Sequence, residues 1–296
     1  MARAERALRR VILTADDFGL AVPVNEAVER AHREGVLTCA SLMVAESAAA
    51  DAIRRARALP SLHVGLHIVL VAGRPLLAPE AIPDLVEPDG TFGTRLARAG
   101  VRFFFHPRIR RQLEAEIRAQ FAAFAAGGLA FDHVNAQCHM HVHPTVLGIV
   151  MRVARDYGRP PVRVPWEPFG PSWRGAHDRL GLRLANAYLL APWLALMKAR
   201  LRAAGIPHND QVFGLNDVGG MTRERVVGLL AQLPPGVTEI FFHAATGRWP
   251  GIAPDLAGYR LEDELATLIS PEVARMLAAA GTETIAFGDL TAAQAR

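Results

Sequence analysis

Residues 11–17, VILTADD, form an apolar run that ends in two adjacent aspartates, and the chain repeats this kind of run at intervals. Apolar, partly β-branched residues bounded by polar or turn-forming ones are typical of a buried strand. The same pattern predicts further strands at residues 38–44, 62–70, 131–135, 162–165, 211–215, 238–243 and 284–287. Stretches with helical spacing separate these runs, so the sequence predicts strands and helices in alternation.

Residues 107–124 have the clearest helical pattern, with Pro107 near the first turn. Apolar residues recur there at spacings of three and four: Ile109, Leu113, Ile117, Phe121 and Phe124. Other helices are expected to begin near residues 24, 47, 144, 184, 222 and 271. This alternation and the length of 296 residues favour a parallel sheet in a single barrel-like (β/α) domain of the α/β class.

Two segments depart from the alternation. Residues 1–10 are rich in arginine and are expected to form a basic extension ahead of a domain that covers residues 11–296. Residues 72–105 contain repeated prolines and the turn-like PDG at 88–90. We expect this segment to be a long loop insertion that forms a wall or lid over the functional face.

Composition and charge narrow the classes of function. The net charge of +4 is spread along the chain and gives little support to nucleic-acid binding. Cys39 and Cys138 are too few for a disulfide framework, and no apolar signal segment follows the N-terminal arginines, so a cytoplasmic protein is expected. The most apolar stretch, residues 184–197, is shorter than a bilayer requires and contains Pro192.

Polar residues stand where several predicted strands end. Asp16 and Asp17 end the first strand, His67 lies late in the third, Arg163 lies in the fifth, and His243 ends the seventh. In a parallel (β/α) fold the carboxyl ends of the strands meet on one face. The sequence therefore predicts that these side chains form one site.

The two aspartates and the histidine of the third strand each have an alternative explanation. At a strand end, Asp16 and Asp17 can reach one cavity, one as a metal ligand and one as a base. The alternative is a helix cap followed by a turn. His67 is either a ligand or a hydrogen-bonded core histidine, and His63, at the start of the same strand, is expected to be structural.

The stretch NAQCHMHVHP at residues 135–144 carries histidines at every second position. In an extended segment, His139, His141 and His143 would lie on one side as candidate ligands for zinc or another divalent metal, whereas a helix would scatter them. Pro144 marks the first turn of a helix, so His143 is expected near its cap and not at a metal.

Four motifs, in this order, carry a resemblance to a known family: TADDFG at 14–19, VGLH at 64–67, DHVNAQCHMHVHP at 132–144 and EIFFHAATG at 239–247. With them the chain resembles the YdjC-like carbohydrate deacetylases, the group that includes chitooligosaccharide deacetylase. The blocks GVRFFFHPRIRRQLEAEIRAQF at 100–121 and RVPWEP at 163–168 resemble the branch associated with hopanoid biosynthesis.

The resemblance implies a distorted (β/α) barrel that removes the acetyl group from an N-acetylated amino sugar with one divalent metal ion, Mg²⁺ or Zn²⁺. On the matched positions, Asp17 and His67 are metal ligands and Asp16 is the catalytic base. His243 is the candidate acid that protonates the departing amine. Arg163 either orients Asp16 or contacts the substrate.

Two positions depart from the family pattern. Gln137 stands where relatives carry the third metal-ligand histidine, and Ala244 replaces a proline beside the histidine that ends the seventh strand. A glutamine oxygen suits Mg²⁺ better than Zn²⁺, and His139 is the alternative third ligand. The candidate substrate contacts are Asn135, His141 and Trp166.

The resemblance also implies a substrate, an N-acetylglucosaminyl hopanoid that is deacetylated to the glucosaminyl lipid. The alternatives are the same reaction on a soluble chitooligosaccharide or its phosphate, and a sugar-binding relative that has lost catalysis through Gln137 and Ala244. With a lipid substrate, residues 184–197 would form an interfacial helix with peripheral contact to the inner membrane. The alternative is a buried helix, and a homodimer is a further candidate assembly.

Overall fold

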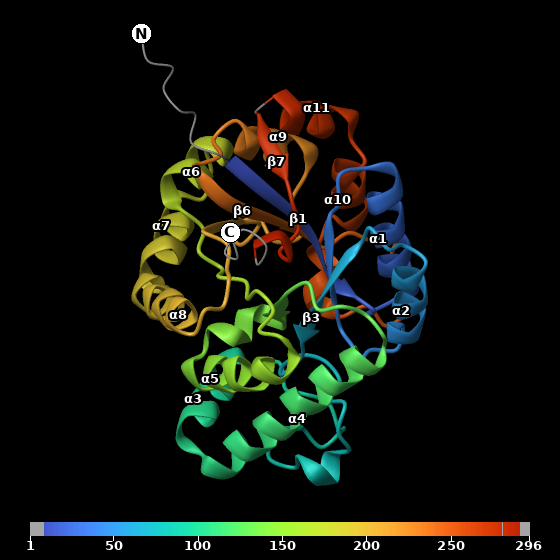
Figure 1. The fold of residues 1–296 in the computed structure, drawn as a ribbon, viewed down its shortest axis with the longest axis vertical. Coiled ribbons are helices and arrows are strands. Elements are labelled where there is room, and N and C mark those ends of the chain that lie inside the picture. Colours follow the sequence, from blue (N-terminus) through green and yellow to red (C-terminus); the bar gives the residue numbers. More distant parts are fainter. Residues whose placement is uncertain (1–8, 280, 291–296) are drawn as a thin grey trace.

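The computed structural model describes residues 9–279 and 281–290, which form a parallel sheet surrounded by helices (Figure 1). The strands are β1 (Arg9–Phe18), β2 (Cys39–Leu42), β3 (His63–Ile68), β4 (Val134–Ala136), β5 (Gln211–Phe213), β6 (Gly236–Phe242) and β7 (Thr282–Thr284). Their order is β4-β3-β2-β1-β6-β5, and β7 pairs with the first residues of β1. Every strand pairing among the described residues is parallel, as the alternation of the sequence predicts.

Residues 161–166 fill the gap between the two ends of this curled sheet. Val162 makes a single bridge to Val134 of β4, and the Val212 N–H of β5 donates to Trp166 O at 2.9 Å. The expectation of a strand at 162–165 is wrong, because prolines at positions 160, 161 and 165 remove the donors that a ladder needs. The predicted distorted (β/α) barrel is confirmed, with an irregular segment in place of one strand.

Helices surround the sheet in the view of Figure 1, with α9 and α11 above it, α3, α4 and α5 below it and others on both sides. They are α1 (Val22–Glu34), α2 (Ala49–Arg57), α3 (Leu96–Phe105), α4 (Pro107–Ala126), α5 (Pro144–Val153), α6 (Phe169–Ala176), α7 (Leu180–Leu189), α8 (Ala191–Ala203), α9 (Arg223–Leu230), α10 (Leu261–Leu268) and α11 (Pro271–Ala279). Short 3₁₀ helices are η1 (Pro79–Ala81), η2 (Gln137–Val142), η3 (Ala154–Tyr157) and η4 (Pro254–Gly258). The helix predicted at 107–124 is confirmed as α4, and all five of its periodic apolar residues are buried.

Two sequence-based boundaries are corrected. Residues 72–105 are not a continuous loop, since they contain η1 and the whole of α3. Phe103 is the buried residue of α3, while Val101 and Phe105 face outward. The apolar residues therefore do not form the single stripe from which a helix is predicted. Residues 1–8 of the expected basic extension lie outside the described residues, and residues 9 and 10 belong to β1.

Candidate metal and catalytic site

A bulge near the end of β1 brings two adjacent aspartates to one imidazole. The register of β1 against β2 shifts between Ala15 and Phe18, and Asp17 takes a φ of 63°. Aspartate enters this left-handed region more readily than most residues, and the turn re-aims its side chain. As a result His67 Nε2 lies 3.5 Å from Asp17 Oδ1, and His67 Nδ1 lies 4.0 Å from Asp16 Oδ1.

Asn135 fixes the orientation of the His67 ring. The two residues are partners in the β3–β4 register, and His67 Nδ1 lies 2.7 Å from Asn135 Oδ1. The Asn135 amide nitrogen donates to Asp16 Oδ1 at 3.2 Å, and since a carboxylate oxygen only accepts, the amide oxygen must face His67. His67 Nδ1 therefore carries the hydrogen, which leaves the lone pair of Nε2 directed at Asp17.

Arg163 is fully buried between two carboxylates. Its Nη1 and Nη2 donate to Asp16 at 2.6 and 2.9 Å, and its Nε and Nη2 donate to Glu239 of β6 at 2.8 and 2.6 Å. Burial alone would raise the pKa of Asp16, but Arg163, with His67, holds that pKa well below its ordinary value. Asp16 is thus a fixed, ionised carboxylate, and Arg163 has no exposed surface with which to contact a substrate.

A chain of buried hydrogen bonds holds Asn135 in place and runs through Ser41 and His133 to Asp132. Its amide nitrogen also donates to Ser41 Oγ at 2.9 Å, and Ser41 Oγ lies 2.9 Å from His133 Nε2. His133 Nδ1 lies 2.8 Å from Asp132 Oδ2, which accepts its hydrogen, so Ser41 donates to His133 Nε2. Every polar atom of the Asn135 side chain is thereby occupied, and the residue is fully buried.

Residues 137–142 fold into η2 and not into an extended strand. Cys138 and His139 take φ values of 50° and 52°, so the alternation that would align the three histidines does not exist. The His139 ring packs 5.5 Å from the Phe241 ring and 6.1 Å from the His141 ring. Burial, reinforced by the nearby guanidinium, lowers the pKa of His139 well below its ordinary value.

The two histidines that follow are held by local contacts. His141 is fully buried, with Nε2 3.0 Å from the carbonyl oxygen of Arg163, and burial lowers its pKa to about 3. His143 caps α5, where its Nδ1 accepts the Thr145 N–H at 3.3 Å, and its ring lies 4.1 Å from that of Phe104. The prediction of a cap role for His143 is confirmed.

His243 follows β6, the strand that pairs with β1 on the side opposite to β2. Its backbone N–H donates to Glu264 Oε2, and its partly buried ring lies 5.4 Å from Tyr259. His243 contributes to the lowered pKa of Asp16, which places the two side chains within electrostatic reach of each other.

Trp166 is partly buried against the core, and Lys198 Nζ of α8 lies 4.6 Å above its ring. Within the described residues no hydrogen bond, ion pair or ring contact joins Trp166 to the carboxylate site. The structure therefore brings together Asp16, Asp17, His67, Asn135 and Arg163 by direct contacts, while Trp166 remains in the wall formed with α8.

The sequence profile of the YdjC-like proteins matches residues 10–279 of the chain. The chain belongs to the YdjC-like family.

Relatives and a solved structure extend this finding. A carbohydrate deacetylase from Geobacillus stearothermophilus is 30% identical over 281 residues, which cover 94% of the chain and 97% of the relative. Another from Brevibacillus brevis is 39% identical over 157 residues, which cover 53% of the chain and 60% of that relative. The structure of an Enterococcus faecalis protein named for cellobiose-phosphate cleavage superposes with a TM-score of 0.74 over 96% of the chain and 99% of its own length, at 23% identity. It shows that the two proteins share a fold.

The donor set of this YdjC-like site fits a divalent metal ion. Two ligand atoms each about 2.1 Å from one ion stand roughly 3.4 Å apart at a tetrahedral angle, close to the 3.5 Å between Asp17 Oδ1 and His67 Nε2. Gln137 has a side-chain oxygen available for such an ion, since its amide nitrogen donates to Ala72 O at 3.1 Å while Oε1 is buried without a hydrogen-bond partner in the described structure.

A second cluster, Cys39 with Asp132 and His133, is the one compact group of three His, Cys, Asp or Glu side chains among the described residues. Its donors do not suit a metal. Both ring nitrogens of His133 are already hydrogen-bonded, one to Asp132 and one to Ser41. Burial is the main cause, and the charge of Asp132 the second, that raises the pKa of the Cys39 thiol well above its ordinary value. The cluster instead belongs to the hydrogen-bond chain that holds Asn135 in place.

We predict that Asn135→Ala lowers the affinity of the YdjC-like site for Zn²⁺ or Mg²⁺ by about 10- to 100-fold, because His67 loses the acceptor that fixes its ring. Titration calorimetry of the two proteins with each metal measures the change. Asn186→Ala on α7, which removes a bond to Asn216, is the matched control and should bind as the wild type does. Unchanged affinity in Asn135→Ala would contradict the role given to this residue.

Glu239 and Ser41 belong to this site but are not among the residues predicted from the sequence. Glu239 lies within the apolar strand TEIFF, where a buried carboxylate requires a cation, and Arg163 lies in the apolar VRVP. A carboxylate in one apolar run and an arginine in another therefore indicate a buried ion pair from the sequence alone. Ser41 carries no such signal, since a serine in an apolar run is common and only the fold brings it to Asn135.

Proposed function

We propose that the chain is a metal-dependent deacetylase that hydrolyses the N-acetyl group of an N-acetylglucosamine-type sugar. The observation that carries this proposal is the lone pair of His67 Nε2 facing Asp17 Oδ1 beside a second, ionised carboxylate on Asp16. Curated relatives are named carbohydrate deacetylases, which agrees with this chemistry.

The ion would be held by Asp17, His67 and Gln137, and when bound it would supply a more acidic water and polarise the acetyl carbonyl. Asp16 would accept the water proton, since it stays ionised and its orientation is fixed by hydrogen bonds from Arg163 and Asn135. We assign both of these neighbours to positioning, because neither has exposed surface.

His243 is the proposed acid for the departing amine. It is partly exposed and lies within electrostatic reach of Asp16, so one side chain can receive a proton while the other delivers one. His139 is half-buried against Phe241 and His141 is fully buried, and both have lowered pKa values. This favours neutral imidazoles that support the site over a direct part in the proton transfers.

We predict that Gln137→His raises the Zn²⁺ affinity of the site about tenfold or more while changing Mg²⁺ affinity little, because imidazole binds zinc better than an amide oxygen does. Calorimetry with both metals measures the effect. His139→Ala is the companion variant: if His139 is the true third ligand, its loss and not the change at 137 will move the Zn²⁺ affinity.

For the substrate, we propose an N-acetylglucosaminyl hopanoid, with the enzyme in the cytoplasm and in peripheral contact with the inner membrane. The support is the apolar, outward-facing surface of α7 and α8 beside the site wall. No single helix of the described chain is long and apolar enough to span a bilayer, and α7 with α8, bent by 43°, meets that requirement only as a pair.

The test is acetate release by the full chain, supplied with Mg²⁺ or Zn²⁺, from a glycolipid in vesicles, a chitooligosaccharide and a chitooligosaccharide phosphate. The proposal expects release from the glycolipid and little from the soluble sugars. Release from the soluble sugars alone would replace the lipid substrate with a soluble one. No release with any metal, followed by release from the Gln137→His variant, would identify a relative weakened at its third ligand.

A further inference from the structure

Exposed apolar side chains concentrate on three helices. Of the large apolar residues that the structure describes as exposed, all but Val22, Leu76 and Val218 belong to α3, α7, α8 or the residue between the last two. Phe105 is 74% exposed and Leu189 is 76% exposed. Isolated exposed apolar residues are ordinary, but a contiguous set marks a contact surface.

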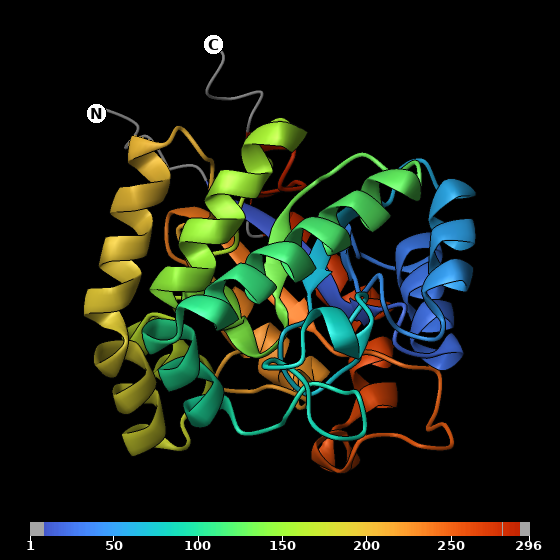
Figure 2. The same cartoon turned by 90° about the horizontal axis from the view of Figure 1, so that it is seen from below.

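These helices form one surface, which we call the apolar face: Val101 and Phe105 of α3, Tyr188 and Leu189 of α7, Leu190, and Trp193 and Leu196 of α8. The ring of Phe104 joins its two parts, lying 6.3 Å from Trp193 and 6.0 Å from Phe105. Figure 2 shows α3 beside α7 and α8 along one side of the molecule. The contact between Phe104 and Trp193 brings α3 against α8 on that side.

The charged residues of α3, α7 and α8 all have one sign, since these helices carry arginine and lysine but no aspartate or glutamate. No aspartate or glutamate occurs between residues 90 and 113 or between residues 179 and 209, whereas arginines recur in both segments. Arg98, Arg108 and Arg111 are exposed and have no carboxylate partner among the described residues. A surface that is apolar at its centre and cationic at its rim is complementary to anionic lipid.

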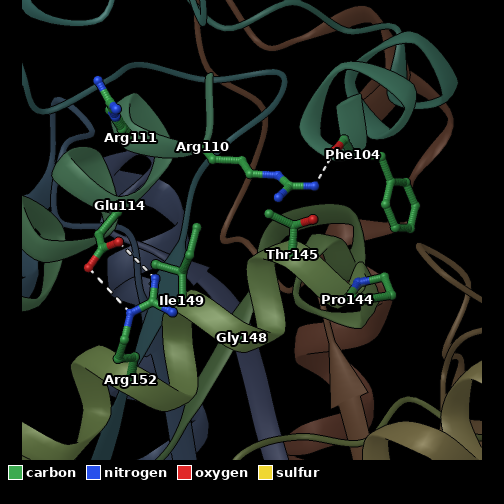
Figure 3. Close-up of a pocket in the computed structure, with 9 residues that line it drawn as sticks. All are labelled: Phe104, Arg110, Arg111, Glu114, Pro144, Thr145, Gly148, Ile149 and Arg152. Carbon is green, nitrogen blue, oxygen red and sulfur yellow. Dashed lines mark hydrogen bonds and ion pairs between the residues drawn. The ribbon is translucent and has the colours of Figure 1, made fainter. Parts of the chain in front are cut away.

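A pocket of about 430 Å³ opens between α3, α4 and α5 at the edge of the apolar face. Glu114 faces Arg152 at one end, with 2.7 Å between them, while the Arg110 guanidinium reaches toward the Phe104 carbonyl at the other (Figure 3). Because Arg152 balances Glu114, the charge left over in the pocket is that of Arg110 and Arg111. This pocket is suited to the phosphate of a lipid headgroup.

The apolar face also adjoins the proposed catalytic site. Phe104 packs against His143, which caps the helix that follows η2 and its Gln137. On the other side, Lys198 of α8 covers Trp166. A lipid surface held against these helices would therefore lie on the side of the molecule that reaches η2 through Phe104 and His143.

We propose that the apolar face docks on an anionic phospholipid bilayer, with Arg108, Arg110 and Arg111 contacting headgroup phosphates. This inference rests on the proposed function, since it names the surface on which the sugar substrate is presented. Phe105, Leu189 and Trp193 enter the boundary between headgroups and acyl chains, and the arginines remain at the level of the phosphates.

The test is flotation of the full-length protein with vesicles of phosphatidylcholine alone or mixed with phosphatidylglycerol, without substrate or metal. Binding is expected to the mixed vesicles, with loss in high salt. The double variant Phe105→Ser, Leu189→Ser should lower the partition coefficient at least about tenfold, and Arg108→Gln or Arg111→Gln about fivefold each. Val22→Ser on α1 and Arg155→Gln on η3 are the matched controls and should bind as the wild type does.

Either of two kinds of result, in vesicle binding or in oligomeric state, would overturn the proposal. One is wild-type protein that binds neither kind of vesicle, or a double variant that binds as well as the wild type. The other is a wild-type dimer that Phe105→Ser, Leu189→Ser converts to a monomer, which would make the apolar face an interface between two copies. Vesicle binding is measured apart from acetate release. If the deacetylase proposal fails, the flotation result therefore still tests whether the apolar face binds the bilayer.

Discussion

Asp17→Asn is expected to lower kcat/KM for acetate release about a thousandfold, because it removes the charged ligand of the proposed metal site. The transition-state stabilisation that a metal ion supplies is several kcal/mol, and each 1.4 kcal/mol is about tenfold in rate. The fold should survive the change. Asn tolerates the φ of 63° at this position, and the shape of the side chain is kept.

Metal content and acetate release of the purified variant measure this effect, and thermal unfolding checks that the fold is intact. Asp89→Asn, in the turn at residues 88–90, is the matched control, since Asn keeps the oxygen that accepts the Thr91 N–H. If Asp17→Asn kept its metal and its activity, the ligand assignment would be wrong.

Arg163→Met is expected to lower the free energy of unfolding by about 3–5 kcal/mol, since it leaves two buried carboxylates without their cation. Asp16 and Glu239 both depend on this guanidinium, and its side chain has no exposed surface. Arg163→Lys should lie between the wild type and Arg163→Met, because an ammonium keeps the charge but cannot bond both carboxylates bidentately.

Urea unfolding of the three proteins measures the difference, with Arg155→Met as the exposed control. The Lys variant separates stability from activity. It should stay folded and still lose activity, because Asp16 is no longer held in one orientation. An Arg163→Met protein as stable as the wild type would show that the buried triad contributes nothing to the fold.

The sequence predicts those parts of the fold in which apolar periodicity and burial agree. VILTADD became β1, and the spacing of Ile109, Leu113 and Phe121 became the buried face of α4. Parallel order followed from the alternation of strands and helices. The convergence of Asp16, Asp17 and His67 followed from their places at strand ends.

Other parts depend on contacts that no local pattern shows. The left-handed residues at 138 and 139 turn NAQCHMHVHP into η2, so the alternation of its histidines misleads. The segment at 162–165 has the apolar pattern of a strand, but its prolines limit it to one bridge. α3 exposes Val101 and Phe105, so its pattern does not indicate a core-facing helix.

The most direct test of the metal site is anomalous diffraction at the zinc edge from crystals of the chain grown with Zn²⁺. We expect one peak about 2.1 Å from Asp17 Oδ1 and His67 Nε2, with Gln137 Oε1 as the third protein ligand. A peak at Cys39, Asp132 and His133 instead, or none between Asp17 and His67, would contradict it.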